Sequence, residues 1–145
     1  MTGRLLRILL AAVFVWSGLS KLIDPIFFFI ALDAFGLPLP VGLLRYLTFF
    51  IPWVEVSAGS LLVLGVWIRP AAWVLASLLI AFSLAIVSLR LRGLDVNCPC
   101  FGSSELICRG PLGNCHLIRN ASLLALAIGV AILDRRHALD RSQSS

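Results

Sequence analysis

The residues best able to react are concentrated in one stretch, because all four cysteines of the 145-residue chain lie between positions 98 and 115. Their thiols could exchange disulfides with another protein. In that interpretation Cys98 and Cys100 form the active pair, while Cys108 and Cys115 form a second pair that passes electrons or locks the segment. A C-x-C disulfide closes a small, strained ring, which suits exchange. Four cysteines allow three pairings, and sequence alone does not choose among them.

Two other interpretations of the cysteines stay open. Two disulfides could staple a segment that has little core of its own. Four thiolates could also bind a metal ion, but C-x-C followed by spacings of eight and seven residues is irregular for such a site. We therefore expect no metal at the cysteines. Arg90 and Arg92 lie shortly upstream and would stabilise a thiolate if their side chains faced the cysteine segment.

A second set of candidates consists of charged residues in or beside apolar runs, namely Lys21, Glu55 and Arg119. A charge at membrane depth is costly unless it is paired or faces a cavity, so such residues are functional candidates by default. We expect all three to lie toward the cysteine end. There they would either bind a cofactor such as a quinone or form a structural ion pair, and both interpretations stay open.

The rest of the chain must position these groups, and its composition indicates a membrane protein. Hydrophobic residues make up 60% of the sequence and charged residues 13%, whereas soluble domains carry about a quarter charged residues. The net charge is +5, but most basic residues lie at the ends of apolar runs, where they anchor helices at lipid headgroups. We therefore expect the lipid bilayer as a partner and no nucleic acid.

Apolar runs of about 20 residues can cross a bilayer as helices. The sequence predicts an all-α membrane protein, a four-transmembrane-helix bundle over residues 1–136, followed by a polar C-terminal tail at 137–145 that is disordered at its end. The segment 26–40 is too broken to span and should lie near the interface. Pro52 should divide the long apolar stretch 41–68. The predicted spans are about 5–22, 49–68, 71–89 and 117–133, with the cysteine loop at 93–115 between helices three and four.

Small residues recur at every fourth position in the third and fourth predicted spans. Such rows let helices approach closely in lipid, so we expect them to be packing faces. The two rows are Ser77, Ala81 and Ala85, and Ala121, Ala125 and Gly129.

Four spans place both termini on one side of the membrane. Basic residues are equally numerous on the two sides, but Arg4 and Arg7 before the first span favour a cytoplasmic N-terminus. Disulfide chemistry belongs outside the reducing cytosol and favours the same orientation. We therefore expect cytoplasmic N- and C-termini and a cysteine loop on the exoplasmic, periplasmic face.

Four segments together are typical of one known family, namely Gly18-Leu19-Ser20-Lys21-Leu22-Ile23-Asp24-Pro25, Pro52-Trp53-Val54-Glu55, Cys98-Pro99-Cys100-Phe101-Gly102 and Arg119-Asn120. Through them the sequence resembles the methylamine utilisation protein MauE family, within the broader DoxX-like group of four-helix membrane proteins. The resemblance runs from about Arg4 to Leu133. One departure is Pro99, since the middle residue of C-x-C is commonly Gly in the family; proline makes direct Cys98–Cys100 pairing less favourable.

The resemblance implies a protein of the bacterial inner membrane linked to periplasmic thiol chemistry and to maturation of methylamine dehydrogenase. We expect an integral membrane thiol–disulfide redox or maturation protein that exchanges disulfides or electrons with a periplasmic thioredoxin-like or cysteine-rich client. As an enzyme it would be a thiol–disulfide oxidoreductase. The alternatives are a non-catalytic assembly factor with a disulfide-stapled docking loop, and a small-molecule or metal-handling membrane protein with Glu55 as the buried ligand.

Overall fold

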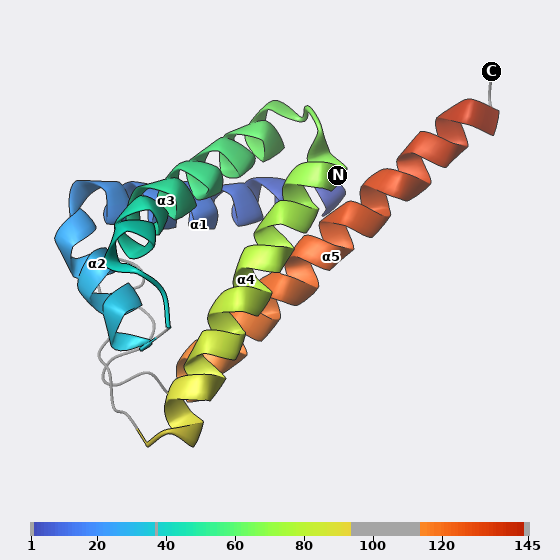
Figure 1. Cartoon of the computed structure of the whole chain (residues 1–145). Coiled ribbons are helices and arrows are strands. Elements are labelled where there is room, and N and C mark those ends of the chain that lie inside the picture. Colours follow the sequence, from blue (N-terminus) through green and yellow to red (C-terminus); the bar gives the residue numbers. More distant parts are fainter. Residues whose placement is uncertain (1, 37, 94–113, 144–145) are drawn as a thin grey trace.

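The computed structural model describes residues 2–36, 38–93 and 114–143, and the side chains of 3–36, 38–93 and 114–134. Within these ranges the regular elements are all helices. Four of them are long and apolar enough to cross a membrane, which confirms the predicted all-α membrane fold; the cysteine loop lies almost wholly outside the described residues. The helices are α1 (Thr2–Ile23), α2 (Pro25–Ala34), α3 (Val41–Leu64), α4 (Ile68–Leu91) and α5 (Asn114–Gln143) (Figure 1).

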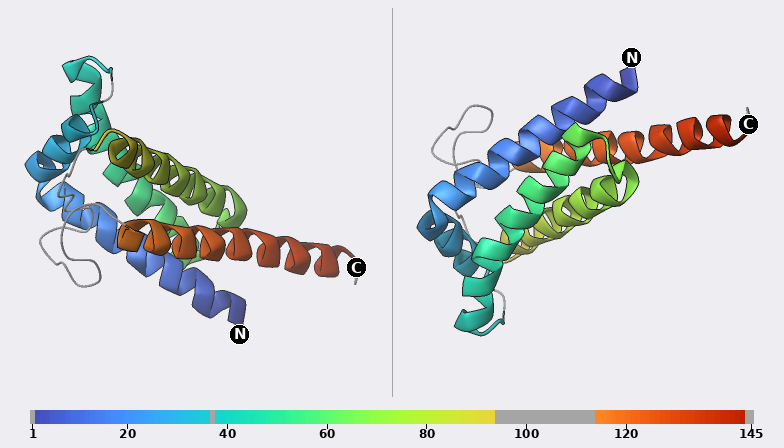
Figure 2. Two further views of the ribbon diagram at one scale, coloured as in Figure 1. Left: turned by 90° about the horizontal axis from the view of Figure 1, so that it is seen from below. Right: turned by 90° about the horizontal axis from the view of Figure 1, so that it is seen from above.

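The long helices pack mainly as two pairs, α1 with α3 and α4 with α5 (Figures 1 and 2). The start of α1, the α3–α4 turn and the end of α5 lie at one end of the molecule. At the other end lie α2, the end of α4 and the start of α5. This places the two termini at the same end, as four spans require. We call the opposite end the α2 end.

Two predicted boundaries were wrong. Pro52 does not divide its segment, because α3 continues through it from Val41 to Leu64 and buries the proline inside the bundle. At 24 residues this helix is about 36 Å long. It ends before the predicted residue 68 because Gly65 adopts a left-handed conformation with φ 76°. The backbone N–H groups of Gly65 and Val66 both donate to the Leu61 carbonyl, which closes the last turn.

The other differences from the predicted spans are extensions. The third spanning helix, α4, begins at Ile68, so that Pro70 lies in its first turn, where a missing N–H costs little. The fourth, α5, continues to Gln143, so the predicted polar tail is helical as far as that residue, and its last two residues lie outside the described ranges. The segment expected near the interface contains a helix of its own, α2. It starts at Pro25, and only Asp24 separates it from the end of α1.

The interior contains two apolar clusters. The larger joins α1, α3, α4 and α5 around fully buried leucines. The smaller joins α2, α3 and α4 at the α2 end. Buried members of the larger cluster include Leu10, Leu62, Leu75 and Ala127, and those of the smaller are Phe28, Leu32, Phe35, Leu44, Ile86 and Leu89.

The predicted rows of small residues are not where the helices approach most closely. Ser77, Ala81, Ala121 and Ala125 are exposed, and a Cβ added at Gly129 would meet nothing within 4 Å. Helices α4 and α5 instead contribute other alanines to the larger cluster, at positions turned toward the bundle. The buried alanines are Ala71, Ala72, Ala76, Ala127 and Ala131.

Close approach occurs between α1 and α3, at glycines that the small-residue pattern did not single out. A Cβ at Gly18 would lie 2.9 Å from the Pro52 carbonyl oxygen, and one at Gly59 would lie 3.3 Å from the Ala11 carbonyl oxygen. Each glycine therefore lets one helix contact the backbone of the other. This contact fixes the register between the two helices that carry Lys21 and Glu55.

Candidate functional site

Lys21 and Glu55 come together because α1 and α3 touch at Gly18. Lys21 lies in the last turn of α1, and Glu55 lies in the middle of α3. Gly18 is one turn before Lys21, and a Cβ there would lie 3.2 Å from the Glu55 Cβ. The close packing thus places the two charged side chains on facing sides of the helix pair.

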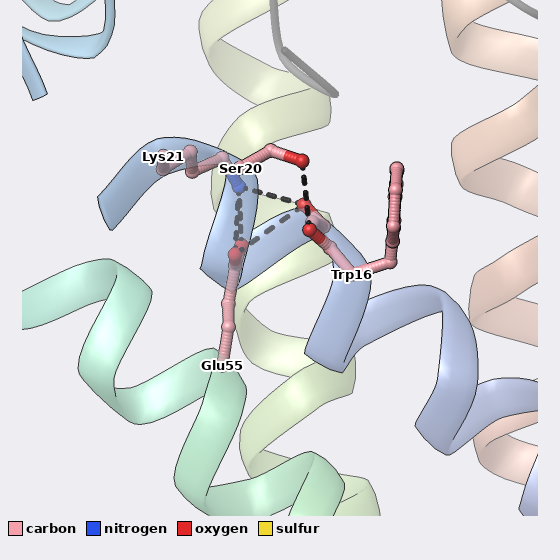
Figure 3. Close-up of polar contacts among 5 residues, drawn as sticks. Trp16, Ser20, Lys21 and Glu55 are labelled. Atoms are coloured by element: carbon pink, nitrogen blue, oxygen red, sulfur yellow. Dashed lines mark hydrogen bonds and ion pairs between the residues drawn. The ribbon is translucent and has the colours of Figure 1, made fainter. Parts of the chain in front are cut away.

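The two side chains form a buried ion pair. Lys21 Nζ lies 2.7 Å from each carboxylate oxygen of Glu55. It also donates to Ser17 Oγ at 3.0 Å, and Ser17 Oγ donates to Glu55 Oε2 at 3.4 Å. Figure 3 shows Lys21 and Glu55 pointing toward each other from the two helices. Lys21 is 5% exposed and Glu55 is 2% exposed, so water does not reach the pair freely.

Two aromatic rings complete the surroundings of the lysine. Lys21 Nζ lies 5.3 Å from the ring centroid of Phe28 on α2 and 5.2 Å from that of Phe82 on α4. The faces of aromatic rings attract cations within about 6 Å. The ammonium is therefore held by a carboxylate, a hydroxyl and two rings from four different helix segments.

A further polar contact lies beside the ion pair, between α4 and α5. The buried amide of Asn120 donates to Ser83 Oγ at 3.4 Å. Arg119 is partly buried in the second turn of α5. A cavity of about 30 Å³ joins these groups to the ion pair. It is lined by Ser17, Lys21, Glu55, Arg119 and Asn120 on its polar side and by Phe14, Leu78, Leu79, Phe82, Ile86 and Leu123 on its apolar side.

This arrangement places Lys21, Glu55 and Arg119 around one cavity inside the bundle. Lys21 and Glu55 balance each other's charge and hydrogen-bond each other, as buried charged groups require. Their contact also provides a direct path by which a proton could pass between amine and carboxylate. The volume of the cavity is enough for one or two water molecules. A larger ligand such as a quinone ring would require the lining side chains to move apart.

The structure describes only one of the four predicted cysteine positions. Cys115 lies in the first turn of α5, at the α2 end, and its sulfur takes part in a disulfide. Cys98, Cys100 and Cys108 lie outside the described residues. Their pairing and their reactivity stay predictions.

Arg90 and Arg92 contact other groups at this end of the bundle. Arg90 Nη1 donates to the Asn114 side chain, which joins the end of α4 to the start of α5. Arg92 Nη1 donates to the Phe35 carbonyl oxygen at 3.0 Å, just beyond α2. Both guanidinium groups therefore have acceptors that do not involve a thiolate.

Sequence reasoning missed Ser17, Phe28, Phe82 and Ser83. Ser17 precedes Lys21 by four residues, so the helical period places both on one face, and this signal could have identified it. The two phenylalanines carry no such signal, because their role depends on how α2 and α4 pack. Among the described residues, no three His, Cys, Asp or Glu side chains are arranged to hold a metal ion. Both oxygens of Glu55, the predicted alternative ligand, contact Lys21 instead.

Comparison with known proteins identifies the family. The family described as methylamine utilisation protein MauE matches residues 1–133. The chain is also similar to the methylamine utilization protein MauE of Paracoccus denitrificans, with 34% identity over 127 residues that cover 87% of this chain. The match spans 66% of that relative's length. No solved structure matches the chain significantly. With its four apolar helices, this multi-pass membrane protein therefore belongs to the MauE family.

Proposed function

We propose that the protein is a thiol–disulfide redox and maturation protein of the bacterial inner membrane. Its cysteines exchange disulfides with a periplasmic thioredoxin-like or cysteine-rich client, and the process served is maturation of methylamine dehydrogenase. The observation that carries the proposal is the disulfide of Cys115 at the α2 end, the same end toward which Lys21 and Glu55 lie. The link of the MauE family to methylamine utilisation supports the choice of process.

The exchange proceeds by two thiolate attacks. A client thiolate attacks one sulfur of the protein's disulfide, which forms a mixed disulfide and releases a thiolate on this protein. The second client thiolate then attacks the mixed disulfide. The client leaves with a new disulfide, and this protein keeps two thiols and the two electrons. Cys98 and Cys100 are the proposed exchanging cysteines, and Cys108 and Cys115 are the second pair.

A quinone is the proposed acceptor that restores the disulfide. Such a group would supply an acceptor for the two electrons and two protons that the two thiols give up when they form the disulfide. Lys21 and Arg119 are the cationic groups that would face its carbonyl oxygens, and Glu55 would keep Lys21 in place. The apolar wall of the cavity, formed by residues such as Phe82 and Leu78, suits a ring. The wall must open to admit it, since the cavity measures about 30 Å³.

The test is client oxidation by the full-length protein in lipid vesicles that contain a quinone. We expect the wild type to convert the thiols of a reduced thioredoxin-like client into a disulfide. Cys98→Ser and Cys100→Ser should each abolish this conversion, because each removes one of the exchanging sulfurs. Alkylation and mass mapping of the same samples would show which pair is reduced. Unchanged client oxidation in both variants would refute the proposal.

A second candidate is a non-catalytic assembly factor whose disulfides staple a client-docking loop. The specific observation that favours it is that both carboxylate oxygens of Glu55 accept hydrogen bonds from Lys21, as in an ion pair that only stabilises the fold. In this case reductant would leave client binding intact, and Cys→Ser variants would lower the amount of protein. Two reduction-resistant disulfides in the mass map would support this candidate over the first.

A further inference from the structure

Helix α2 covers the buried ion pair at the α2 end of the bundle. It follows α1 after one residue, Asp24, and starts at Pro25. Its inner face packs Phe28 and Leu32 against α3 and α4, and Phe35, just beyond its end, joins the same cluster. Phe28 also places its ring over the Lys21 ammonium. The short helix therefore separates Lys21 from the surroundings on this side.

Apolar packing alone holds such a cover weakly in a membrane. Lipid tails solvate apolar side chains about as well as a protein interior does, so the hydrophobic effect adds little between helices there. The outer face of α2 is itself apolar, with Ile26, Phe27 and Ile30 all more than half exposed. At 10 residues, α2 is also shorter than the ~12–15 residues below which isolated helices are marginal. A polar contact is needed to keep it in place.

Arg92 supplies that contact. Its Nη1 donates to the carbonyl oxygens of Phe35 at 3.0 Å and Gly36 at 3.5 Å, and its Nη2 donates to Gly36 at 3.4 Å. Within the described part of the chain, these are the hydrogen bonds that join the end of α2 to another helix. Gly36 adopts φ +57°, and a Cβ there would lie 2.5 Å from Arg92 Nη2. Both the left-handed backbone and the missing side chain thus make room for the guanidinium.

We propose that α2 is the movable cover of the Lys21–Glu55 site and that Arg92 is the positioning residue that keeps it closed. Asp24 provides the hinge, because it is the single residue between two helices and has non-helical φ −126° and ψ 68°. Opening would bring water and small polar molecules from the α2 end to Glu55. The cover itself does not depend on the thiol chemistry proposed above.

The test measures how fast a water-soluble carbodiimide modifies Glu55 in the full-length protein in lipid vesicles. The reagent activates the carboxyl group, which then forms an amide either with an added amine or with Lys21 Nζ, 2.7 Å away, and releases a urea; both products are counted. Mass spectrometry of the peptide that contains Glu55 gives the rate. Arg92→Gln should raise the rate about tenfold, the effect of losing hydrogen bonds from a charged group. Arg92→Lys should give a smaller increase, because it keeps the charge and loses the planar set of donors.

Arg7→Gln is the matched control. The Arg7 guanidinium lies over Gly65 at the opposite end, where a Cβ would meet Arg7 Nη1 at 3.0 Å. This variant should leave Glu55 labelling unchanged, and Glu55→Gln should abolish it. Hydrogen exchange on the same proteins should show faster exchange of α2 amides in Arg92→Gln, with α1 and α3 unchanged. The proposal would be overturned if Glu55 in Arg92→Gln were labelled at the wild-type rate, or if Arg7→Gln raised the labelling rate as much as Arg92→Gln does.

Discussion

Lys21 and Glu55 show how a charged pair can be stable inside an apolar bundle. Each carboxylate oxygen accepts from Lys21 at 2.7 Å, and Ser17 contacts both partners. The cost of removing two charges from water is repaid only when geometry and additional hydrogen bonds are good, and both conditions hold here. Removing one partner would leave the other as an uncompensated buried charge.

A double-mutant cycle tests this dependence. Lys21→Met and Glu55→Gln should each lower the free energy of unfolding by about 3–5 kcal/mol, the usual cost of breaking a buried pair. The double variant should recover most of that loss, because no unpaired charge remains. Reversible denaturation of the four proteins in the same detergent micelles gives the values. Additive losses in the double variant would contradict the pairing.

At the residue scale the sequence predicts the charged groups and not their surroundings. Lys21, Glu55 and Arg119 stand out because a charge within an apolar run is rare. The choice of Lys21 as the partner of Glu55 depends on the register of α1 against α3, which Gly18 sets by allowing contact with the α3 backbone. Pattern alone cannot fix such a register. The same limit applies to Phe28, whose role depends on the turn at Asp24.

At the scale of the elements, the contact between α1 and α3 depends on glycine. Gly18 faces the Pro52 carbonyl oxygen and the Val56 side chain, while Gly59 faces the Ala11 carbonyl oxygen and Val15. An added methyl group would therefore push against backbone atoms that cannot rotate away. The two helices would move apart at the level of the ion pair.

Gly18→Ala and Gly59→Ala should accordingly each destabilise the protein by about 1–3 kcal/mol, the typical cost of overpacking. Gly129→Ala is the control, because it lies within α5 and a Cβ there meets nothing within 4 Å. It should be neutral or stabilise by up to about 1 kcal/mol, since alanine is a better helix former than glycine. Thermal unfolding in one detergent compares the three. Similar losses in all three variants would show that close approach is not the cause.

The long helices were predictable and their ends were less so. Apolar length identifies four spans, because only helices of about 20 residues satisfy the backbone across a bilayer. The break expected at Pro52 is wrong, because α3 accommodates the proline inside the bundle. The actual end, at Gly65, depends on a left-handed residue and on space for the Arg7 guanidinium. A sequence shows that a glycine is present there, and does not show that the chain turns at it.

At the scale of the whole molecule, basic residues lie at both ends of the bundle. At the α2 end, Lys21 is neutralised by Glu55, and Arg92 is bound to the carbonyls that follow α2. Arg92 keeps its positive charge, because carbonyl groups are neutral, and Arg45 and Arg90 are also exposed toward this end. At the opposite end, Arg4 and Arg69 are exposed. Exposed basic residues thus lie at both ends, and the cytoplasmic termini stay a prediction that rests on Arg4 and Arg7 before the first span.

A pair of reporter fusions tests this orientation in the cell that makes the protein. A reporter that is active only in the periplasm should be inactive when fused after Gln143, at the end of α5. The same reporter fused after Gly93, where α4 has just ended, should be active, because an odd number of spans then precedes it. A cytoplasmic fluorescent protein at the same two points should give the reverse pattern. Periplasmic activity at Gln143 with none at Gly93 would invert the orientation and place Cys115 and the α2 cover in the reducing cytosol, where a stable disulfide is not expected.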